Sequence, residues 1–129
     1  MKNKILLLGL FCCSLISANA QVLLDKGTGK NSFPIVSSST NAVVCFDGKD
    51  ATVVRKSASL FVDDVRRVTG QELKMDESKP GKVSARYAII AGTIGESGWI
   101  DVLASRNKID TAAIAGSWER YMIEVVNNP

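Results

Sequence analysis

The sequence predicts a small two-layer α/β domain, in which one small mixed β-sheet carries two main helices. Short apolar runs rich in β-branched residues alternate with two helical patterns, in the order β-α-β-β-α-β. The length of 129 residues leaves room for one modest domain. A composition of 46% hydrophobic and 22% charged residues excludes disordered and disulfide-scaffold classes. A sheet covered by helices is the natural way to bury such elements.

The first twenty residues have the three parts of a secretory signal peptide. Lys2 and Lys4 precede an apolar stretch at residues 5–16, and residues 18–20 read Ala-Asn-Ala, a small-x-small cleavage site. The apolar stretch is too short for a comfortable membrane span. We therefore expect residues 1–20 to be removed and the protein to be exported, to the periplasm or the cell exterior, with no membrane span after cleavage.

The mature chain begins with an irregular segment at residues 21–40 and continues as an α/β domain at residues 41–129. Residues 42–46 (Ala-Val-Val-Cys-Phe) form a compact apolar run that predicts a buried strand. Residues 47–50 read Asp-Gly-Lys-Asp and predict the turn that follows. Asp50 is placed to cap the next helix at its N-terminus.

Residues 51–69 carry the clearest helical pattern of the chain. Apolar residues recur at spacings of three and four and predict one buried face: Val54, Ala58, Phe61, Val65 and Val68. Arg66 and Arg67 fall in the last turn, where cations suit the helix dipole. Gly70 can adopt the left-handed conformation that ends a helix.

The middle of the chain predicts two further strands. Residues 72–75 alternate in polarity and predict a short strand, whereas residues 76–82 hold charged residues, proline and glycine and predict an exposed loop. Residues 87–91 are apolar and predict a second buried strand.

The last part of the chain predicts a turn, a helix and a final strand. Residues 92–98 contain three glycines and predict a turn, and residues 99–105 predict a short helix. Residues 108–116 predict an irregular segment. Residues 121–126 (Tyr-Met-Ile-Glu-Val-Val) predict the last strand.

Residue counts exclude several kinds of chemistry. Histidine is absent, so the chain contains no His-based zinc site, Ser-His-Asp triad or Cys-His dyad. Cys12 and Cys13 lie in the signal peptide. Cys45 is left without a disulfide partner inside an apolar strand, which predicts a small buried hydrophobic side chain.

The charge balance gives no electrostatic case for nucleic acid. The chain has 16 Lys and Arg against 13 Asp and Glu, and Lys2 and Lys4 belong to the signal peptide, which leaves 14 against 13. A nearly neutral domain lacks the basic surface that binds phosphate backbones. No cofactor is indicated either.

The turn at residues 92–98 is the feature most suggestive of a binding site. Its binding candidates are Gly92, Thr93, Gly95, Glu96 and Ser97. The glycine spacing is G-x-x-G-x-x-G, which differs from the dinucleotide fingerprint, and Glu96 would repel a phosphate. A sugar-facing or domain-facing loop and a plain tight turn are the other interpretations, and the tight turn is the simplest.

Carboxylates and tryptophans are the remaining candidates for sugar chemistry. Glycoside hydrolysis needs two carboxyl groups across a sugar, and three pairs occur: Asp47 with Asp50, Asp63 with Asp64, and Asp76 with Glu77. Spacing assigns none of them a partner at the required separation, so surface and capping roles are expected. Trp99 and Trp118 could stack on a sugar ring, but their apolar surroundings predict core positions.

An ordered series of short motifs resembles the N-terminal region of glycoside hydrolase family 115. The matching segments are Gly92-Thr93-Ile94-Gly95-Glu96-Ser97, Ile100, Leu103, Lys108-Ile109-Asp110 and Gly116-Ser117-Trp118-Glu119. The block Asp63-Asp64-Val65-Arg66-Arg67-Val68-Thr69-Gly70 is similar to the end of that family's first helix. The resemblance covers residues 33–129.

The resemblance implies an exported xylan α-1,2-glucuronidase, which removes glucuronic acid or its 4-O-methyl form from glucuronoxylan with inversion. It also implies a small α/β first domain, with the catalytic apparatus mainly in a (β/α)₈ barrel that follows. Such a barrel takes about 250 residues, which this sequence does not include, so no catalytic or metal-binding residue is carried over. We expect a truncated first domain that is inactive alone and whose intramolecular partner is the barrel. The alternative is a standalone secreted carbohydrate-binding or protein-interaction module.

Overall fold

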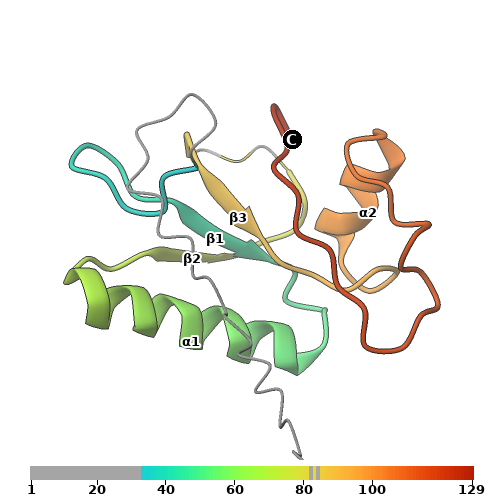
Figure 1. The fold of residues 1–129 in the computed structure, drawn as a ribbon, viewed down its shortest axis with the longest axis horizontal. Helices are drawn as coiled ribbons and strands as arrows, with labels where there is room; N and C mark the ends of the chain where they lie inside the picture. The colour runs from blue at the N-terminus through green and yellow to red at the C-terminus, as the bar shows by residue number, and fades with distance from the viewer. Residues whose placement is uncertain (1–32, 82, 84) are drawn as a thin grey trace, which may run out of the picture.

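The computed structural model describes residues 33–81, 83 and 85–129 (Figure 1). It confirms the α/β class. In chain order, the elements are β1 (Val43–Phe46), α1 (Thr52–Thr69), β2 (Lys74–Glu77), β3 (Ala88–Ile90) and α2 (Gly98–Ser105). The predicted signal peptide at residues 1–20 lies outside the described residues, as does most of the segment at residues 21–40. Within the described part of the chain, no helix combines the length and apolar composition needed to cross a membrane.

The three strands form a parallel sheet in the order β2-β1-β3. Val43 at the start of β1 is in register with Lys74 on one side and Ala88 on the other. The sheet is therefore parallel throughout the described residues, where a mixed sheet was predicted. The predicted mixed sheet included a fourth, C-terminal strand, which is not formed.

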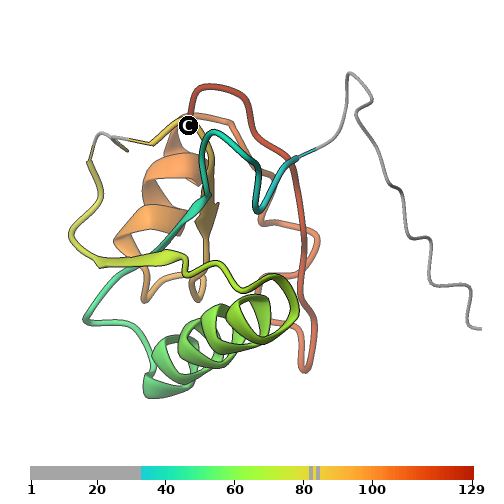
Figure 2. The same cartoon turned by 90° about the vertical axis from the view of Figure 1, so that its left-hand side faces the viewer.

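Residues 121–126, predicted to be the last strand, pair with no described strand, so this prediction is wrong. The segment is extended but makes no sheet ladder. Its residue types favour a strand, but a strand also needs a neighbour in register, and neighbours are not encoded in local sequence. Figure 2 shows this segment on the side of β3 that faces away from β1.

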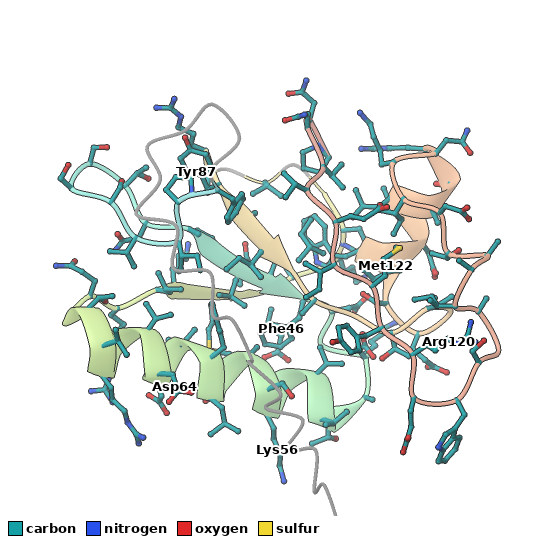
Figure 3. The ribbon with its side chains drawn as sticks, in the orientation of Figure 1. Phe46, Lys56, Asp64, Tyr87, Arg120 and Met122 are labelled. Atoms are coloured by element: carbon teal, nitrogen blue, oxygen red, sulfur yellow. The ribbon has the colours of Figure 1, made fainter. Side chains whose placement is uncertain are left out.

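The main core lies between α1 and the sheet. Its buried members are Val44, Phe46, Ala58, Val62 and Leu73. Phe46 lies between β1 and α1, whereas Lys56 and Asp64 point away from the sheet (Figure 3). Because successive residues of a strand face opposite sides, Val44 and Phe46 face α1 together.

The buried face of α1 differs from the prediction at its C-terminal end. Val54, Phe61 and Val65 are half-buried against the core, as predicted. Val62 is buried although the predicted stripe omitted it. Val68 is 84% exposed, so its predicted core position is wrong. The apolar face is thus confirmed over the first three-quarters of the helix.

The residues at the two ends of α1 can be compared with the predicted caps. Gly70 has a φ of 72° and its N–H donates to the carbonyl of Arg66, which confirms the predicted left-handed end. At the other end the N-cap residue is Ala51, without a side-chain cap. The predicted capping role of Asp50 is therefore wrong, because this carboxylate is engaged elsewhere, as described below.

The second helix, α2, lies on the opposite side of the sheet from α1, beyond the carboxyl ends of the strands (Figures 1 and 2). Trp99 and Leu103 are its buried residues. The Trp99 indole Nε1–H donates to the carbonyl of Ser78 at 2.9 Å, which ties α2 to the loop after β2. Trp99 is a core residue, as predicted. Trp118 is 87% exposed, so its predicted core position is wrong.

The segment boundaries around β2 also shift. The strand runs from Lys74 to Glu77, two residues later than the predicted 72–75, and takes its last two residues from the predicted loop at 76–82. Parallel pairing with β1 fixes this register, with Asp76 beside Cys45. Alternation alone could not set it.

Candidate functional site

The topology places a candidate site at the carboxyl ends of β1 and β3. The chain leaves β1 for a neighbour on one side (β2) and later returns to the other side (β3). In open parallel sheets, ligands bind outside the carboxyl ends of strands where the connections diverge in this way. Asp47 directly follows β1, and the glycine-containing turn at residues 92–98 follows β3. The carboxyl edge, as we call this region, comprises residues 47–50 and 92–98.

Asp47 joins the end of β1 to the start of α2. Its Oδ2 accepts a hydrogen bond from the backbone N–H of Gly98 at 3.1 Å, and its Oδ1 accepts one from the N–H of Lys49 at 3.0 Å. These two N–H donors lower the pKa of the Asp47 carboxyl below its usual value. The N-terminus of a helix favours negative charge, and here a carboxylate of the protein itself occupies that position.

Asp50 makes the second link across the carboxyl edge. Its Oδ2 accepts a hydrogen bond from the N–H of Thr93 at 2.8 Å, and its Oδ1 accepts one from the N–H of Ala51 at 2.6 Å. The two aspartates of the turn after β1 therefore hold both ends of the turn after β3. This contact explains why Asp50 does not cap α1.

Most backbone donors of the turn at residues 92–98 are already engaged. The N–H of Gly95 donates to Asp101 Oδ1 at 3.3 Å, and those of Glu96 and Ser97 donate to the carbonyl of Thr93. Including the N–H groups bound by Asp47 and Asp50, five of the seven residues in this turn donate to the protein. A phosphate cradle needs such donors free and convergent. The arrangement therefore disfavours the nucleotide interpretation.

Two of the glycines are required by the geometry of the turn. Gly95 has a φ of 80°, which residues with side chains rarely adopt. At Gly92 a Cβ atom would lie 2.3 Å from the Oγ of Ser97 and 2.8 Å from a side-chain carbon of Ile100. The turn thus packs its own backbone against the start of α2.

Ser97 is the only described polar side chain that is fully buried. Its hydroxyl has no hydrogen-bond partner among the described residues, although Ser97 is the N-cap residue of α2. The close approach of Gly92 confines this hydroxyl. It is therefore a packed group inside the turn and does not face a ligand.

The five predicted binding candidates lie in one turn, and only two of them present a polar side chain to solvent. The side chains of Thr93 and Glu96 are exposed, Ser97 is buried, and Gly92 and Gly95 shape the backbone. One hydroxyl and one carboxylate facing solvent can hydrogen-bond a hydroxyl-rich or polar surface. Their role in binding remains a prediction.

Three of the four carboxylates in the other two pairs form ion pairs with nearby arginines. On α1, Asp63 and Asp64 each pair with an arginine three residues later, at 3.2 Å and 4.0 Å, on the exposed face. Glu77 on β2 forms an ion pair with Arg55 of α1. These exposed pairs are the surface roles that the sequence predicted, and such pairs contribute little to stability.

Cys45 is buried in the central strand, as predicted. Burial and, to a smaller extent, the neighbouring Asp76 carboxylate raise the pKa of its thiol to about 11, although Lys74 acts in the opposite direction. A thiol held in its neutral form is a poor nucleophile. This agrees with the interpretation of Cys45 as a small hydrophobic residue.

The sequence pointed to the residues of the carboxyl edge but not to their pairing. The sequence alone offers Asp47 and Asp50 as a carboxylate pair and Asp50 as a helix cap, whereas in the structure both hold the turn after β3. A parallel pairing of the strands at 42–46 and 87–91 would have placed both turns at one edge. The local sequence does not specify that parallel pairing, so the contact between the two turns could not be predicted from it.

Comparison with models of known protein families gave no match. A search of curated proteins also found no match. Within the described residues, no three Cys, Asp or Glu side chains gather as a metal-binding group.

Proposed function

We propose that this chain is the non-catalytic N-terminal α/β domain of an exported glycoside hydrolase resembling the family 115 α-glucuronidases. In the full-length enzyme, a catalytic barrel would remove glucuronic acid or 4-O-methylglucuronic acid from glucuronoxylan, and this domain would support it. The motif series at residues 92–119 supplies the resemblance. The domain acts as a folded support and carries no reaction of its own.

The observation that carries this proposal is that two aspartates tie the turns of the carboxyl edge to each other. The place where an α/β enzyme of this topology would bind its ligand is held by Asp47 on Gly98 and by Asp50 on Thr93. Asp47, Asp50 and most backbone donors there hydrogen-bond within the protein. Because these groups are already hydrogen-bonded within the protein, a supporting role is favoured over a catalytic one.

Two assays test the proposal. The full chain, incubated with glucuronoxylan, is expected to release no glucuronic acid, and release above that of a buffer control would contradict the proposal. Fused ahead of a family 115 catalytic barrel that lacks its own first domain, the chain is expected to yield an active glucuronidase. An inactive fusion would also count against the proposal, provided that the barrel with its own first domain is active.

A second candidate function, a carbohydrate-binding module, is favoured by one observation. The Trp118 ring is 87% exposed, and Tyr121 is exposed close by in the chain. Exposed aromatic rings offer flat faces for sugars to stack on. Titration with xylo-oligosaccharides and glucuronic acid should then change the fluorescence of Trp118, and Trp118→Ala should abolish the change. Absence of binding at millimolar ligand would exclude this function.

A further inference from the structure

Strand β2 leaves one edge of the sheet unpaired. It is the outermost strand in the order β2-β1-β3, and β1 is its only neighbour among the described strands. On β1, the N–H of Val43 and the C=O of Cys45 bond toward β3, so the groups of Val44, which lies between them, bond toward β2. Val44 is in register with Met75, and in a parallel pair such a residue bonds to the neighbours of its register partner. The N–H and C=O of Met75 itself therefore point to the free edge.

Three residues of this stretch direct their backbone groups to the free edge. Leu73 and Glu77 lie two residues before and after Met75, so their groups point the same way. No N–H or C=O group of these three residues bonds to any described residue outside the ladder with β1. Outward backbone groups of this kind are a template for pairing with another strand.

A groove runs along the same edge, between β2 and α1. It is lined by Val62, Glu72, Leu73, Lys74 and Met75. The Met75 side chain packs against the core on the α1 face of the sheet and is half-buried. Because successive residues of a strand face opposite sides, Lys74 and Asp76 both lie on the other face. A strand that adds to this edge would cover the groove.

The charges of β2 determine which strand can add. A row of charges of one sign keeps other strands away from an edge. Here a cation and an anion, Lys74 and Asp76, stand two residues apart on one face of the strand. An antiparallel copy of the same strand presents these two charges in reverse order, so it is complementary to the original.

We propose that β2 pairs antiparallel with β2 of a second copy of this chain, about a twofold axis at Met75, which joins the two three-stranded sheets into one sheet. In this register Met75 faces Met75 of the second copy, and Leu73 faces Glu77 in both directions. These are the residues whose backbone groups point outward, so each facing pair exchanges two hydrogen bonds. Such self-complementarity is what a twofold interface requires.

The charges select this register over its neighbours. Lys74 lies directly opposite Asp76 of the second copy, and the axis forms this pair twice. Residues that face each other in this way are about 4.5 Å apart at Cα, whereas the like charges are diagonal neighbours at about 7–8 Å, so attraction dominates. An axis at Lys74 would set two lysines face to face, and an axis at Asp76 would set two aspartates face to face.

The helices fit the same arrangement. Since the axis is perpendicular to the joined sheet, both copies of α1 lie on one face of it. Each α1 packs against β1 and β2, which puts its axis about 5 Å from the twofold axis at a strand spacing of about 4.8 Å. The two helices are then about 10 Å apart, a distance at which helices pack.

A small residue on α1 faces the second copy. Arg55 forms an ion pair with Glu77 of β2, and Val62 lines the groove, so this flank of α1 lies on the side of the free edge. Ser59 is exposed and adjoins both residues on the helix surface, four positions after Arg55 and three before Val62. Its short side chain permits the close approach of the second α1.

The size of the contact predicts a weak dimer. The edge of β2 and one flank of α1 supply fewer residues than the about 20–30 on each side of a stable interface. We expect a monomer–dimer equilibrium that responds to concentration between about 10 µM and about 1 mM. Sedimentation velocity on the full chain measures it, and a chain that stays monomeric to about 1 mM would overturn the proposal.

Charge reversal tests the pairing of Lys74 with Asp76. Lys74→Asp and Asp76→Lys each set like charges face to face twice and should weaken dimerisation at least about tenfold. An equimolar mixture of the two variants should associate, because every facing pair is then of opposite sign. Asp64→Lys, on the exposed face of α1, is the control and should leave dimerisation unchanged. If the two variants are folded by circular dichroism and do not associate with each other, the proposal is wrong.

Disulfide trapping tests the register and does not depend on those variants. In a Cys12→Ser/Cys13→Ser background, Met75→Cys puts two thiols opposite each other at a separation that a disulfide can span. Glu77→Cys puts its two thiols about 13 Å apart along the strands. Mild oxidation should therefore crosslink the first variant and not the second. Equal crosslinking of both variants, or of neither, would contradict an axis at Met75.

Discussion

The turn at residues 92–98 determines the environment of the Ser97 side chain. Its hydroxyl is fully buried and has no partner among the described residues. A buried hydroxyl without a hydrogen bond destabilises the folded state, because it has given up its bonds to water. The position is set by packing against Gly92 rather than by a cap on α2.

We therefore expect Ser97→Ala to raise the free energy of unfolding by about 1 kcal/mol. Urea unfolding at neutral pH measures the change. Ser105→Ala is the matched control, because the Ser105 hydroxyl is on the same helix, is exposed and donates to the carbonyl of Val102. A loss of stability in Ser97→Ala would show that the hydroxyl has a bonding partner that the packing does not reveal.

The ionised carboxylate of Asp47 stabilises the folded state, so the free energy of unfolding depends on pH. Backbone donors at Lys49 and Gly98 lower the pKa of its carboxyl in the folded state. The unfolded chain therefore binds the proton more readily. This contribution is present above the pKa of the unfolded chain and is lost as the pH falls through the lower pKa of the folded state.

We expect Asp47→Asn to be less stable than the parent chain at pH 7, with the difference shrinking as the pH is lowered toward the acid range. The amide keeps one acceptor oxygen and loses the other, together with the charge. Urea midpoints measured across the acid range give the comparison, and Asp64→Asn on the exposed face of α1 is the control. A difference between Asp47→Asn and the parent that does not change with pH would contradict the role of the charge.

At the scale of elements, the length of α1 against the sheet decides which of its apolar residues are buried. Eighteen residues of helix span about 27 Å, whereas strands of three or four residues span about 10–13 Å. The helix is therefore longer than the surface that can cover it. Its C-terminal turn extends past the strands, which leaves Val68 exposed although its spacing fits the apolar stripe.

This difference in length predicts that valine-to-alanine substitutions at two positions of α1 change the free energy of unfolding by different amounts. Val62→Ala should lower the free energy of unfolding by about 2 kcal/mol, because it removes buried methyl groups and leaves a cavity. Val68→Ala should change it by less than about 0.5 kcal/mol. Urea unfolding of the two variants provides a matched comparison. Similar losses at both positions would mean that another surface covers the end of α1.

The elements also show what local sequence can predict. Helix α1 was predicted with its end at Gly70, because spacing, charge and the glycine stop are all encoded within one stretch. The strand at residues 121–126 was predicted equally from composition, but a strand forms only against a neighbour. Residues 121–126 pair with no described strand, so their apolar composition alone did not make a strand.

For the whole molecule, the fold class was predictable and the carboxyl edge was not. The order of elements follows from local patterns, whereas the contact between Asp50 and Thr93 spans 43 residues. That contact depends on β1 and β3 lying side by side in parallel, which no local signal specifies. Burial of Cys45 was predictable for the complementary reason, because an apolar run of that kind is central in any arrangement of these strands.

The central position of Cys45 makes it a reporter of global unfolding. β1 lies between β2 and β3, so exposing the Cys45 thiol requires separating β1 from both neighbours. The folded thiol has a pKa of about 11, so at pH 8 only about one folded molecule in a thousand carries the reactive thiolate. Modification by a thiol reagent should therefore proceed through the unfolded state.

In a Cys12→Ser/Cys13→Ser background, the free energy obtained from the rate of Cys45 modification should equal that from urea unfolding. Val62→Ala, in the core between α1 and the sheet, should then speed modification about thirtyfold, the equivalent of about 2 kcal/mol. Val68→Ala should leave the rate nearly unchanged. If Val62→Ala lowered the urea midpoint without changing the rate of modification, Cys45 would be reached by a local opening of β1, and the sheet would not unfold as one unit.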